Sequence, residues 1–372
     1  MRNGHRTTIK YTSLIILIVA LFRFWVSHVN VPLKCYSDEE GNKGIEYGPT
    51  ALELQSEHVL LNFISKRTLH EPLFIIVLAD SGRVGSSLLA ELLSSDTNTI
   101  LFFEPLFKLN KSPKLENGTF VSQFLEKVLN CTYDDKFEKW FKYHVLFRRF
   151  YHPVVKDCQK TKNETDCVKH VDFRGLCKAS TVRIIKVIRS PLMSVEKLLN
   201  RQDLNLRILH LQRDPRAALS SINKIGWKAR PQKICTQMLA NTLAFEAFVQ
   251  KHPSKLHKVR YEDLCQYPRD TVSKIYSFLW NNSTIPEPVV NYIASHMETE
   301  KNVKGPMSRT KDSKNEAQAW RREIKDTLFM DAEKEFTCRM SIERYGHRVF
   351  WSVVDLRNPK IPIALYEDEE RN

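Results

Sequence analysis

Residues 74–87 read FIIVLADSGRVGSS, an apolar run followed by a turn of small residues. The apolar run predicts a buried β-strand over residues 73–79, and the turn opens a helix expected over residues 86–95. Glycines let a backbone approach an anion closely, while helix N-terminal N–H groups and serine hydroxyls supply hydrogen-bond donors. The segment is therefore typical of a loop that binds phosphate.

This loop differs from a Walker loop, which needs four residues between its glycines and then Gly-Lys-Ser/Thr. Here only Arg83 and Val84 separate Gly82 from Gly85, and Ser86 stands where the lysine would be. The loop is built for a nucleotide phosphate but lacks the lysine that serves a γ-phosphate. The pattern therefore argues against an ATPase.

A second segment has a related design. Residues 206–212 read LRILHLQ and predict another buried strand, which runs into RDPRAALSS at residues 213–221. Pro215 is placed to start a helix. Arg213 at the strand end and Ser221 two turns into the helix could converge on one phosphate, because arginine offers a fork of donors and serine a hydroxyl.

Together these segments resemble the carbohydrate sulfotransferases, in particular the Golgi enzymes that sulfate the 6-hydroxyl of galactose, N-acetylgalactosamine or N-acetylglucosamine. In that family the donor is 3′-phosphoadenosine 5′-phosphosulfate (PAPS). An Arg-Ser-Gly-Ser-Ser loop holds its 5′-phosphosulfate, and an Arg-Asp-Pro-Arg-Ala segment with a later serine holds its 3′-phosphate. The resemblance implies donor-binding roles for Ser81, Gly82, Arg83, Val84, Gly85, Ser86, Ser87, Arg213, Asp214, Pro215, Arg216, Ala217, Ala218, Leu219, Ser220, Ser221 and Arg309.

The resemblance extends over residues 72–347 and is weakest between residues 107 and 180. Further matching segments follow in order at residues 103–105, 259–264, 308–309 and 318–321. Val84 replaces a usual serine, Gly82 a common tryptophan and Gln212 a usual valine. None of these departures removes an essential donor. Ser86 and Ser87 could instead cap the helix, and Arg216 and Arg309 are the weaker candidates for the 3′-phosphate.

Sulfuryl transfer moves a sulfuryl group from a mixed anhydride to an alcohol. The acceptor hydroxyl must lose a proton, and the charge on the departing phosphate must be neutralised. Positioning and electrostatics supply most of the acceleration, as in phosphoryl transfer. This chemistry requires no metal, and the sequence shows no cluster of metal ligands. We expect Arg83 to neutralise the charge; the alternative is a surface loop arginine.

Glu104 is the first candidate for the catalytic base, because it leaves the second predicted strand on the ligand side and Pro105 should hold it extended. A helix-capping or salt-bridged glutamate is an equal alternative. His210 is the second candidate, although a histidine inside an apolar strand is more usually a core residue. Lys186 and Arg189 could contact an anionic acceptor or form surface salt bridges.

Apolar strands alternate with helices along the chain, which predicts a P-loop-like three-layer α/β domain with a central parallel sheet covered on both faces. Both phosphate motifs follow strands, where open α/β sheets bind ligands. The strands are expected at residues 73–79, 99–103, 182–188, 206–212 and 258–261. The helices are expected at residues 86–95, 119–129, 192–200, 215–225, 233–251, 270–279, 288–296 and 331–344.

Residues 11–31 are mostly apolar and follow Arg2, Arg6 and Lys10 with no acidic residue before them. They predict an uncleaved transmembrane signal anchor with a cytoplasmic tail at residues 1–10 and a lumenal catalytic domain. A cleaved signal peptide is the alternative. We therefore expect a single-pass type II protein of the Golgi membrane. Its stem would be residues 32–71, its sulfotransferase domain 72–348 and its C-terminal tail 349–372.

Glycosylation sequons and cysteines agree with a lumenal location. The sequons begin at Asn117, Asn130, Asn163, Asn281 and Asn282. All eight cysteines follow the anchor and allow 105 pairings. At least one local bridge is expected among Cys158, Cys167 and Cys177. A zinc site is a poorer interpretation, because no Cys-x-x-Cys pair is present in that stretch.

The chain has 57 basic and 43 acidic residues, a formal net charge of +14. Such a surface can bind anionic polysaccharide, nucleic acid or membrane headgroups, and a lumenal location argues against nucleic acid. Two alternatives to a sulfotransferase stay open: a P-loop kinase of small molecules, which would want a Walker lysine, and a non-catalytic lumenal glycan-binding protein. The sequence leaves the acceptor sugar and the oligomeric state open.

Overall fold

The computed structural model describes residues 71–96, 98–109, 112–143, 158, 164–188, 190–299 and 312–365. The expected anchor and almost all of the expected stem lie outside these residues. So do Arg189, Arg309 and Asn163, which the sequence had singled out. No helix in the described ranges is both long enough and apolar enough to cross a membrane.

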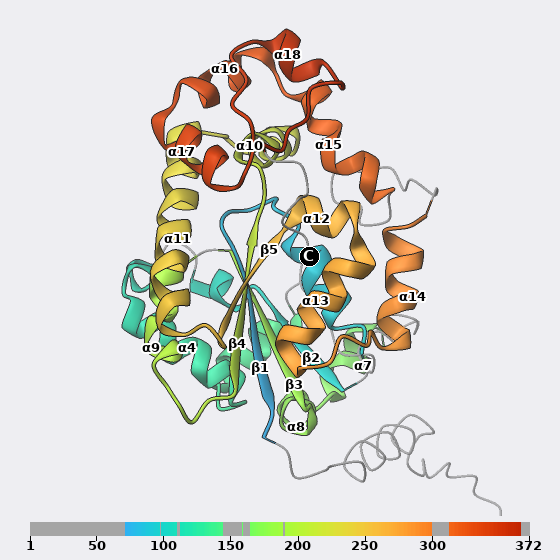
Figure 1. Cartoon of the computed structure of the whole chain (residues 1–372). Coiled ribbons are helices and arrows are strands. Elements are labelled where there is room, and N and C mark those ends of the chain that lie inside the picture. The colour runs from blue at the N-terminus through green and yellow to red at the C-terminus, as the bar shows by residue number, and fades with distance from the viewer. Residues whose placement is uncertain are drawn as a thin grey trace, which may run out of the picture. The chain divides into compact units, whose positions relative to one another are not determined.

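A parallel sheet of five strands forms the centre of the described part of the chain, in the order β2-β3-β1-β4-β5 (Figure 1). This confirms the predicted α/β class. The strands are β1 (Leu73–Ala79), β2 (Thr99–Phe103), β3 (Val182–Val187), β4 (Leu206–Gln212) and β5 (Leu256–Arg260). The first three strands are buried along their whole length, as expected of parallel strands covered on both faces.

Strand β1 lies at the middle of the sheet and pairs with two neighbours. Val77 is in register with Lys186 of β3 on one side and with Leu209 of β4 on the other. The chain leaves β1 toward β2 and leaves β3 toward β4, which are opposite directions across the sheet. Such a switch point opens a crevice at the carboxyl ends of the strands, where ligands bind in open α/β sheets.

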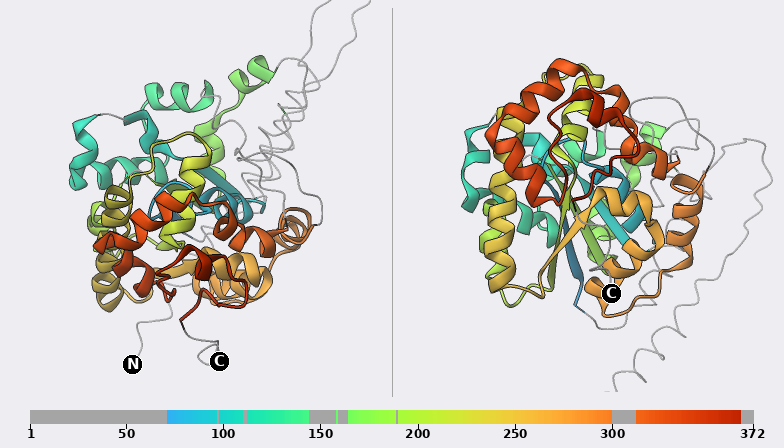
Figure 2. Two further views of the ribbon diagram at one scale, coloured as in Figure 1. Left: turned by 90° about the horizontal axis from the view of Figure 1, so that it is seen from above. Right: turned by 45° about the horizontal axis from the view of Figure 1, so that its top comes forward.

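Helices cover both faces of the sheet, and the views in Figures 1 and 2 agree on their arrangement. One face carries α3, α13 and α14, and the other carries α4, α9 and α11. Their bounds are α3 (Ser86–Leu93), α4 (Gly118–Leu129), α9 (Glu196–Leu199), α11 (Pro231–Lys251), α13 (Pro268–Trp280) and α14 (Glu287–His296). The expected helix at 192–200 begins as a 3-10 turn, η4 (Leu192–Val195), and continues as α9.

A group of helices lies beyond the carboxyl edge of the sheet (Figure 1). It comprises α10 (Pro215–Lys224), α15 (Ser313–Glu323), α16 (Asp326–Lys334), α17 (Phe336–Arg344) and α18 (Val353–Arg357). Their core buries the side chains of Ala217, Trp320, Phe329, Phe350, Leu356 and Ile363. The segment after the expected boundary at residue 348 therefore packs against α10, the helix of the second phosphate motif.

One predicted helix was wrong. Residues 331–344 form no single helix, because Glu335 has an extended backbone and separates α16 from α17. The Glu335 side chain accepts the Thr337 N–H and so caps α17. The apolar periodicity continues through the break, whereas the cap decides where the second helix begins.

The weakly patterned region between residues 107 and 180 contains several short elements that the sequence did not predict. They are η1 (Pro105–Leu109), η2 (Pro113–Glu116), α5 (Asp135–Tyr143), α7 (Glu164–His170) and α8 (Phe173–Ala179). Disulfides Cys131–Cys177 and Cys158–Cys167 cross-link this region. The expected local bridge among its cysteines is thus confirmed.

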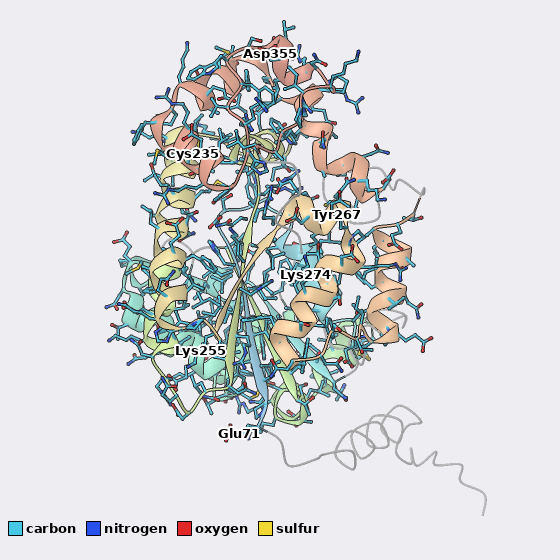
Figure 3. The ribbon with its side chains drawn as sticks, viewed as in Figure 1. Glu71, Cys235, Lys255, Tyr267, Lys274 and Asp355 are labelled. Carbon is cyan, nitrogen blue, oxygen red and sulfur yellow. A yellow bond between two sulfur atoms is a disulfide. The ribbon has the colours of Figure 1, made fainter. Side chains whose placement is uncertain are left out.

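A third disulfide, Cys235–Cys338, joins α11 to α17. Cys235 lies beside the C-terminal helices in Figure 3, whereas Glu71 and Lys255 mark the opposite edge of the sheet. Of the cysteines in the described ranges, Cys265 in α12 (Tyr261–Gln266) is a buried free thiol.

The Cys235–Cys338 disulfide should contribute more stability than the short-range Cys158–Cys167 disulfide. It closes a loop of 103 residues, whereas Cys158–Cys167 closes one of nine. The chain-entropy model gives about 5 kcal/mol for a loop of about 100 residues and about 2.5 kcal/mol for nine. Replacing both cysteines of each pair by alanine and measuring chemical unfolding should therefore show the larger loss for the 235/338 pair. Equal losses would contradict this ranking.

Candidate functional site

The first loop joins β1 to α3 at the carboxyl edge of the sheet. Arg83 and Gly85 both have left-handed backbone conformations, with φ of 72° and 93°. Gly85 occupies the N-cap position of α3, and no side chain hydrogen-bonds to this helix end. The alternative role of Ser86 and Ser87 as N-caps is therefore not seen. A helix N-terminus without a side-chain cap presents N–H donors and a partial positive charge to an anion.

Gly85 is the one loop position that the surrounding structure restricts to glycine on two counts. Its φ is positive, and a Cβ atom there would lie 2.2 Å from the Tyr261 ring. Tyr261 begins α12 directly after β5 and is almost fully buried. The loop backbone thus packs directly on an aromatic ring, which fixes its height above the sheet.

The two motifs meet at the carboxyl edge of the sheet through Arg83, which contacts both Arg213 and Ser221. An Nη1 of Arg213 donates to the carbonyl oxygen of Arg83 at 2.9 Å. The Nε of Arg83 donates to the hydroxyl of Ser221 at 3.2 Å. Strands β1 and β4 are neighbours, so the loops that follow them come together although they are 130 residues apart. We call these three residues the Arg83–Arg213–Ser221 junction.

The junction concentrates positive charge in a poorly hydrated place. Burial, followed by repulsion from Arg213, lowers the pKa of Arg83 from its usual value. The lowered pKa means that the charged form of Arg83 is less stable here than in water. A bound anion would remove that penalty, so the electrostatics suit a phosphate or sulfate group.

Arg213 has unused donor capacity. Its guanidinium stacks on the Tyr261 ring at 4.2 Å from the ring centroid. Its Nε is buried and, within the described residues, has no hydrogen-bond acceptor. A buried donor without an acceptor costs about 1–3 kcal/mol, which a ligand oxygen would recover. The arginine is therefore held in place by stacking and left ready for an anion.

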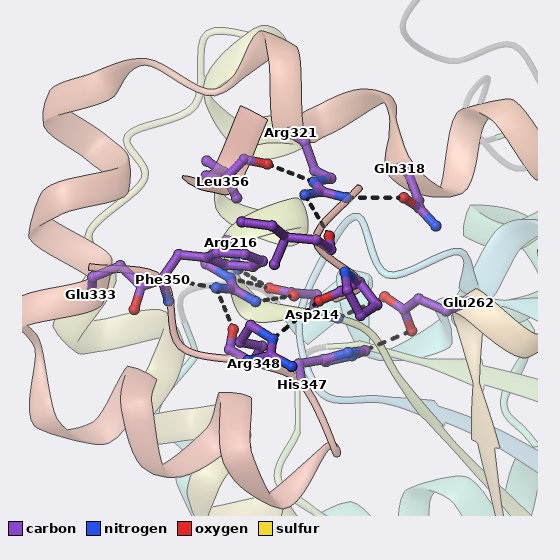
Figure 4. A network of polar contacts seen from close by, with 12 residues as sticks. Asp214, Arg216, Glu262, Gln318, Arg321, Glu333, His347, Arg348, Phe350 and Leu356 are labelled. Atoms are coloured by element: carbon purple, nitrogen blue, oxygen red, sulfur yellow. Dashed lines mark hydrogen bonds and ion pairs between the residues drawn. The ribbon is translucent and has the colours of Figure 1, made fainter. Parts of the chain in front are cut away.

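Arg216, a weaker donor-binding candidate from the sequence, lies in a different network (Figure 4). It is fully buried. Its guanidinium contacts the carboxylates of Asp214 at 2.7 Å and Glu333 at 2.6 Å, and donates to the carbonyl of Arg348 at 2.9 Å. Asp214 belongs to the same motif, whereas Glu333 lies in α16 and Arg348 follows α17. We assign Arg216 the structural role of tying the second motif to the C-terminal helices.

The rest of the second motif shapes the start of α10. Pro215 is the first residue of the helix, and Asp214 is its N-cap, accepting the N–H of Arg216. Burial raises the pKa of Asp214, but Arg216 outweighs this and holds the pKa below its usual value. Asp214 therefore stays a carboxylate. The remaining motif residues before Ser221 are buried in α10: Ala217, Ala218, Leu219 and Ser220.

Glu104 does not adopt the expected extended conformation, since its φ is 51°. Its N–H donates to the carbonyl of Lys186, and its own carbonyl accepts the N–H of Phe107 as the chain turns into η1. These two bonds override the local preference that Pro105 imposes. Non-glycine residues in this conformation cost about 1–3 kcal/mol and concentrate at functional sites.

The Glu104 side chain forms an ion pair with Lys186, Oε1 to Nζ, at 2.5 Å. Both residues are buried, and the ammonium also lies 3.9 Å from the centre of the Phe103 ring. The salt-bridged interpretation of Glu104 is therefore realised in the structure. Lys186 is only 2 % exposed. It is therefore placed to hold this carboxylate and not to contact a large acceptor.

His210 is a buried core residue, which the sequence analysis gave as the alternative to a catalytic base. It has no exposed surface, its Nε2 lies 2.5 Å from Oδ1 of Asp80, and its ring stacks on Phe245. Tyr345 donates to the other carboxylate oxygen of Asp80, also at 2.5 Å. These residues anchor the end of β1 directly before the phosphate loop. Sequence reasoning missed Asp80 and Tyr261, because their partners lie far away along the chain.

The sequons differ in accessibility. Asn117, Asn281 and Asn282 are exposed, and Asn130 is partly buried beside the Cys131 disulfide. Among the described residues, no group of three or more His, Cys, Asp or Glu side chains could hold a metal ion.

Comparisons with known proteins point in one direction. The sequence pattern of the sulfotransferase family matches residues 72–280, which contain both loops. Carbohydrate sulfotransferase 1 of Danio rerio is 25% identical over 371 residues, covering 84% of this chain and 85% of that protein. Human carbohydrate sulfotransferase 1 is 22% identical over 352 residues, with coverage of 79% and 84%. The solved sulfotransferase domain of the Synechococcus PCC 7002 olefin synthase aligns with 77% of this chain and 99% of its own, at 16% identity and a TM-score of 0.41.

Two matched substitutions can separate the stability lost through a collision with Tyr261 from the stability lost through backbone strain at positive φ. Gly85→Ala and Gly346→Ala both place a side chain at positive φ, but only the first collides with a neighbour. Strain alone costs about 1–2 kcal/mol. Chemical unfolding should show a clearly larger loss for Gly85→Ala, and adding Tyr261→Ala to it should cost less than Tyr261→Ala costs alone. Similar losses for the two glycine variants would mean that the loop can move away from the ring.

Proposed function

Because the chain belongs to the sulfotransferase family, we propose that it transfers a sulfuryl group from PAPS to a hydroxyl group of a carbohydrate. The observation that carries this proposal is the Arg83–Arg213–Ser221 junction, which brings the two motifs predicted to bind phosphate to one edge of the sheet. A donor with phosphate groups at both its 3′ and 5′ positions needs two such motifs, whereas ATP does not. The carbohydrate acceptor is supported by the names of the similar proteins.

The donor-binding residues follow from the loops. The 5′-phosphosulfate would bind residues 81–87 at the start of α3, and the 3′-phosphate would bind Arg213 and Ser221. The residues fit this ligand, since Arg213 keeps an unpaired buried Nε and α3 lacks a side-chain cap. PAPS supplies the sulfuryl group as a mixed anhydride. Arg83 would neutralise the charge that develops on the departing phosphate.

Glu104 is the proposed base for the acceptor hydroxyl. It follows β2, two positions from β1 in the sheet, and faces the same carboxyl edge as the donor loop. Its ion pair with Lys186 and its left-handed backbone hold the carboxylate in one orientation. We assign Lys186 the positioning of that carboxylate.

The acceptor is proposed to be a hexose or N-acetylhexosamine within a glycan or glycosaminoglycan, sulfated at its 6-hydroxyl. The net charge of +14 favours an anionic polymer. The enzyme would work in the Golgi, anchored by residues 11–31 with residues 72–348 in the lumen. The three disulfides among the described residues and the exposed sequons support an oxidising, glycosylating compartment.

Turnover by the full-length protein tests the reaction. With labelled PAPS it should sulfate at least one of chondroitin, keratan and N-acetylglucosamine-terminated oligosaccharides, and ATP should not replace the donor. Linkage analysis of the product would show whether the 6-hydroxyl is modified. Phosphoryl transfer from ATP would instead support the kinase alternative.

The role of Glu104 can be separated from its ion pair. Glu104→Gln should lower turnover about 10²–10⁴-fold, because positioned acid–base catalysis contributes that much. The same variant leaves the Lys186 ammonium buried without its carboxylate, which itself costs stability. The double variant Glu104→Gln/Lys186→Met removes both charges and is the matched control. It should fold better than the single variant and stay equally inactive.

Recovery of turnover in the double variant would show that Glu104 serves only to neutralise Lys186. Donor affinity, measured with 3′-phosphoadenosine 5′-phosphate (PAP), should stay near that of the wild type in both variants, since neither residue belongs to the donor loops.

A further inference from the structure

The link between α10 and α11 carries a half-exposed tryptophan on a fixed backbone. Trp227 has 49% of its surface exposed. Gly226 before it has a φ of 76° and donates to the carbonyl of Asn223, while the Trp227 N–H donates to the carbonyl of Ile222 at 3.2 Å. This is the glycine cap that ends many helices. The indole is therefore presented to solvent from a rigid helix end.

Trp227 stands beside the first phosphate loop. A Cβ atom built on Gly82 would lie 3.6 Å from Cζ3 of the indole, an ordinary van der Waals contact. Gly82 directly precedes Arg83, which contacts Ser221 on the same helix that Trp227 terminates. The indole thus lies against the loop assigned to the 5′-phosphosulfate.

The segment around this ring is strongly basic. Residues 224–233 read KIGWKARPQK, with four basic residues and no acidic one. Lys224 pairs with Glu323. Lys228, Arg230 and Lys233 are exposed, and the structure shows no ion pair for these three with any described residue. An exposed aromatic ring flanked by uncompensated cations is suited to a ligand that has both apolar faces and negative charges.

We propose that Trp227 is an acceptor-binding residue, whose indole stacks on the C–H face of a sugar ring while Lys228 and Arg230 bind anionic groups of the same glycan. This inference rests on the proposed function. A pyranose has an apolar face that an aromatic ring can cover. Uronate or sulfate groups on neighbouring sugars would reach the cations. The donor's own phosphates are already assigned to the loop and to Arg213 and Ser221, so they leave these cations unoccupied.

Steady-state kinetics of the full-length enzyme test the stacking. Trp227→Ala and Trp227→Leu should raise the KM for the best acceptor among chondroitin, keratan sulfate and desulfated keratan about tenfold, the scale of one lost aromatic contact with its buried area. The KM for PAPS should stay within about twofold. Trp227→Phe keeps a ring and should change the acceptor KM by about threefold or less. The matched control is Trp280→Ala, since Trp280 is also partly exposed but stacks on Tyr276 of its own helix.

Charge recognition has its own variant. Lys228→Ala/Arg230→Ala should raise the KM for chondroitin and keratan sulfate by about tenfold but leave that for desulfated keratan unchanged, and added salt should shrink the difference. Melting curves would confirm that each variant is folded, and Trp227→Leu retains apolar bulk if Trp227→Ala does not fold.

Three outcomes would overturn the inference. An unchanged acceptor KM in Trp227→Leu would remove the stacking role, and a raised KM for PAPS alone would place the indole against the nucleotide. A wild-type preference for desulfated keratan would remove the charge role. Failure of the wild type to sulfate any acceptor would instead sink the proposed function, and the inference with it.

Discussion

The contact between Arg213 and the carbonyl of Arg83, continued by Arg83 to Ser221, is the interaction on which the site depends. It exists because β1 and β4 are adjacent parallel strands whose following loops must share one edge of the sheet. The junction holds two guanidinium groups close together in a half-buried place. Their positive charges repel each other, and a bound anion would offset this repulsion. Tyr261 supports both halves, since its ring lies under Gly85 and against Arg213.

The C-terminal helices stabilise the Arg83–Arg213–Ser221 junction through residues next to it in the sequence. Arg216 belongs to the second motif, yet its guanidinium binds the carboxylates of Asp214 and Glu333 and the backbone carbonyl of Arg348. Breaking a buried charge network of this kind by removing one partner costs about 3–5 kcal/mol. Tyr345 reaches back to Asp80 before the first loop. The C-terminal segment is thus a structural support of both phosphate motifs, tied in addition by the Cys235–Cys338 disulfide.

Much of the fold could be predicted because buried parallel strands are continuous apolar runs, and the sequences of β1 and β4 show this plainly. The position of both motifs at the carboxyl edge of the sheet was also predictable, since both follow strands, whereas the contacts that Arg83 makes with Arg213 and Ser221 were not. The conformation of Glu104 was not, because its backbone bonds to Lys186 and Phe107 override the effect of the following proline. The break at Glu335 depends on a side-chain cap that interrupts an otherwise continuous pattern. The roles of Tyr261 and Trp227 could not be predicted from the sequence. Tyr261 lies beside the loop because of the strand order, and Trp227 because of the glycine cap of α10.

Thermal stabilisation by nucleotides tests the central claim, that the two motifs form one site for a doubly phosphorylated donor. A ligand present at 100 times its Kd stabilises by about 2.7 kcal/mol, so PAP should raise the melting temperature clearly, and AMP, which lacks the 3′-phosphate, much less. Arg213→Ala should reduce the effect of PAP to that of AMP, whereas Arg344→Ala, which removes an exposed arginine paired with Glu246, should leave it intact. Equal stabilisation of the wild type by PAP and AMP would contradict the account.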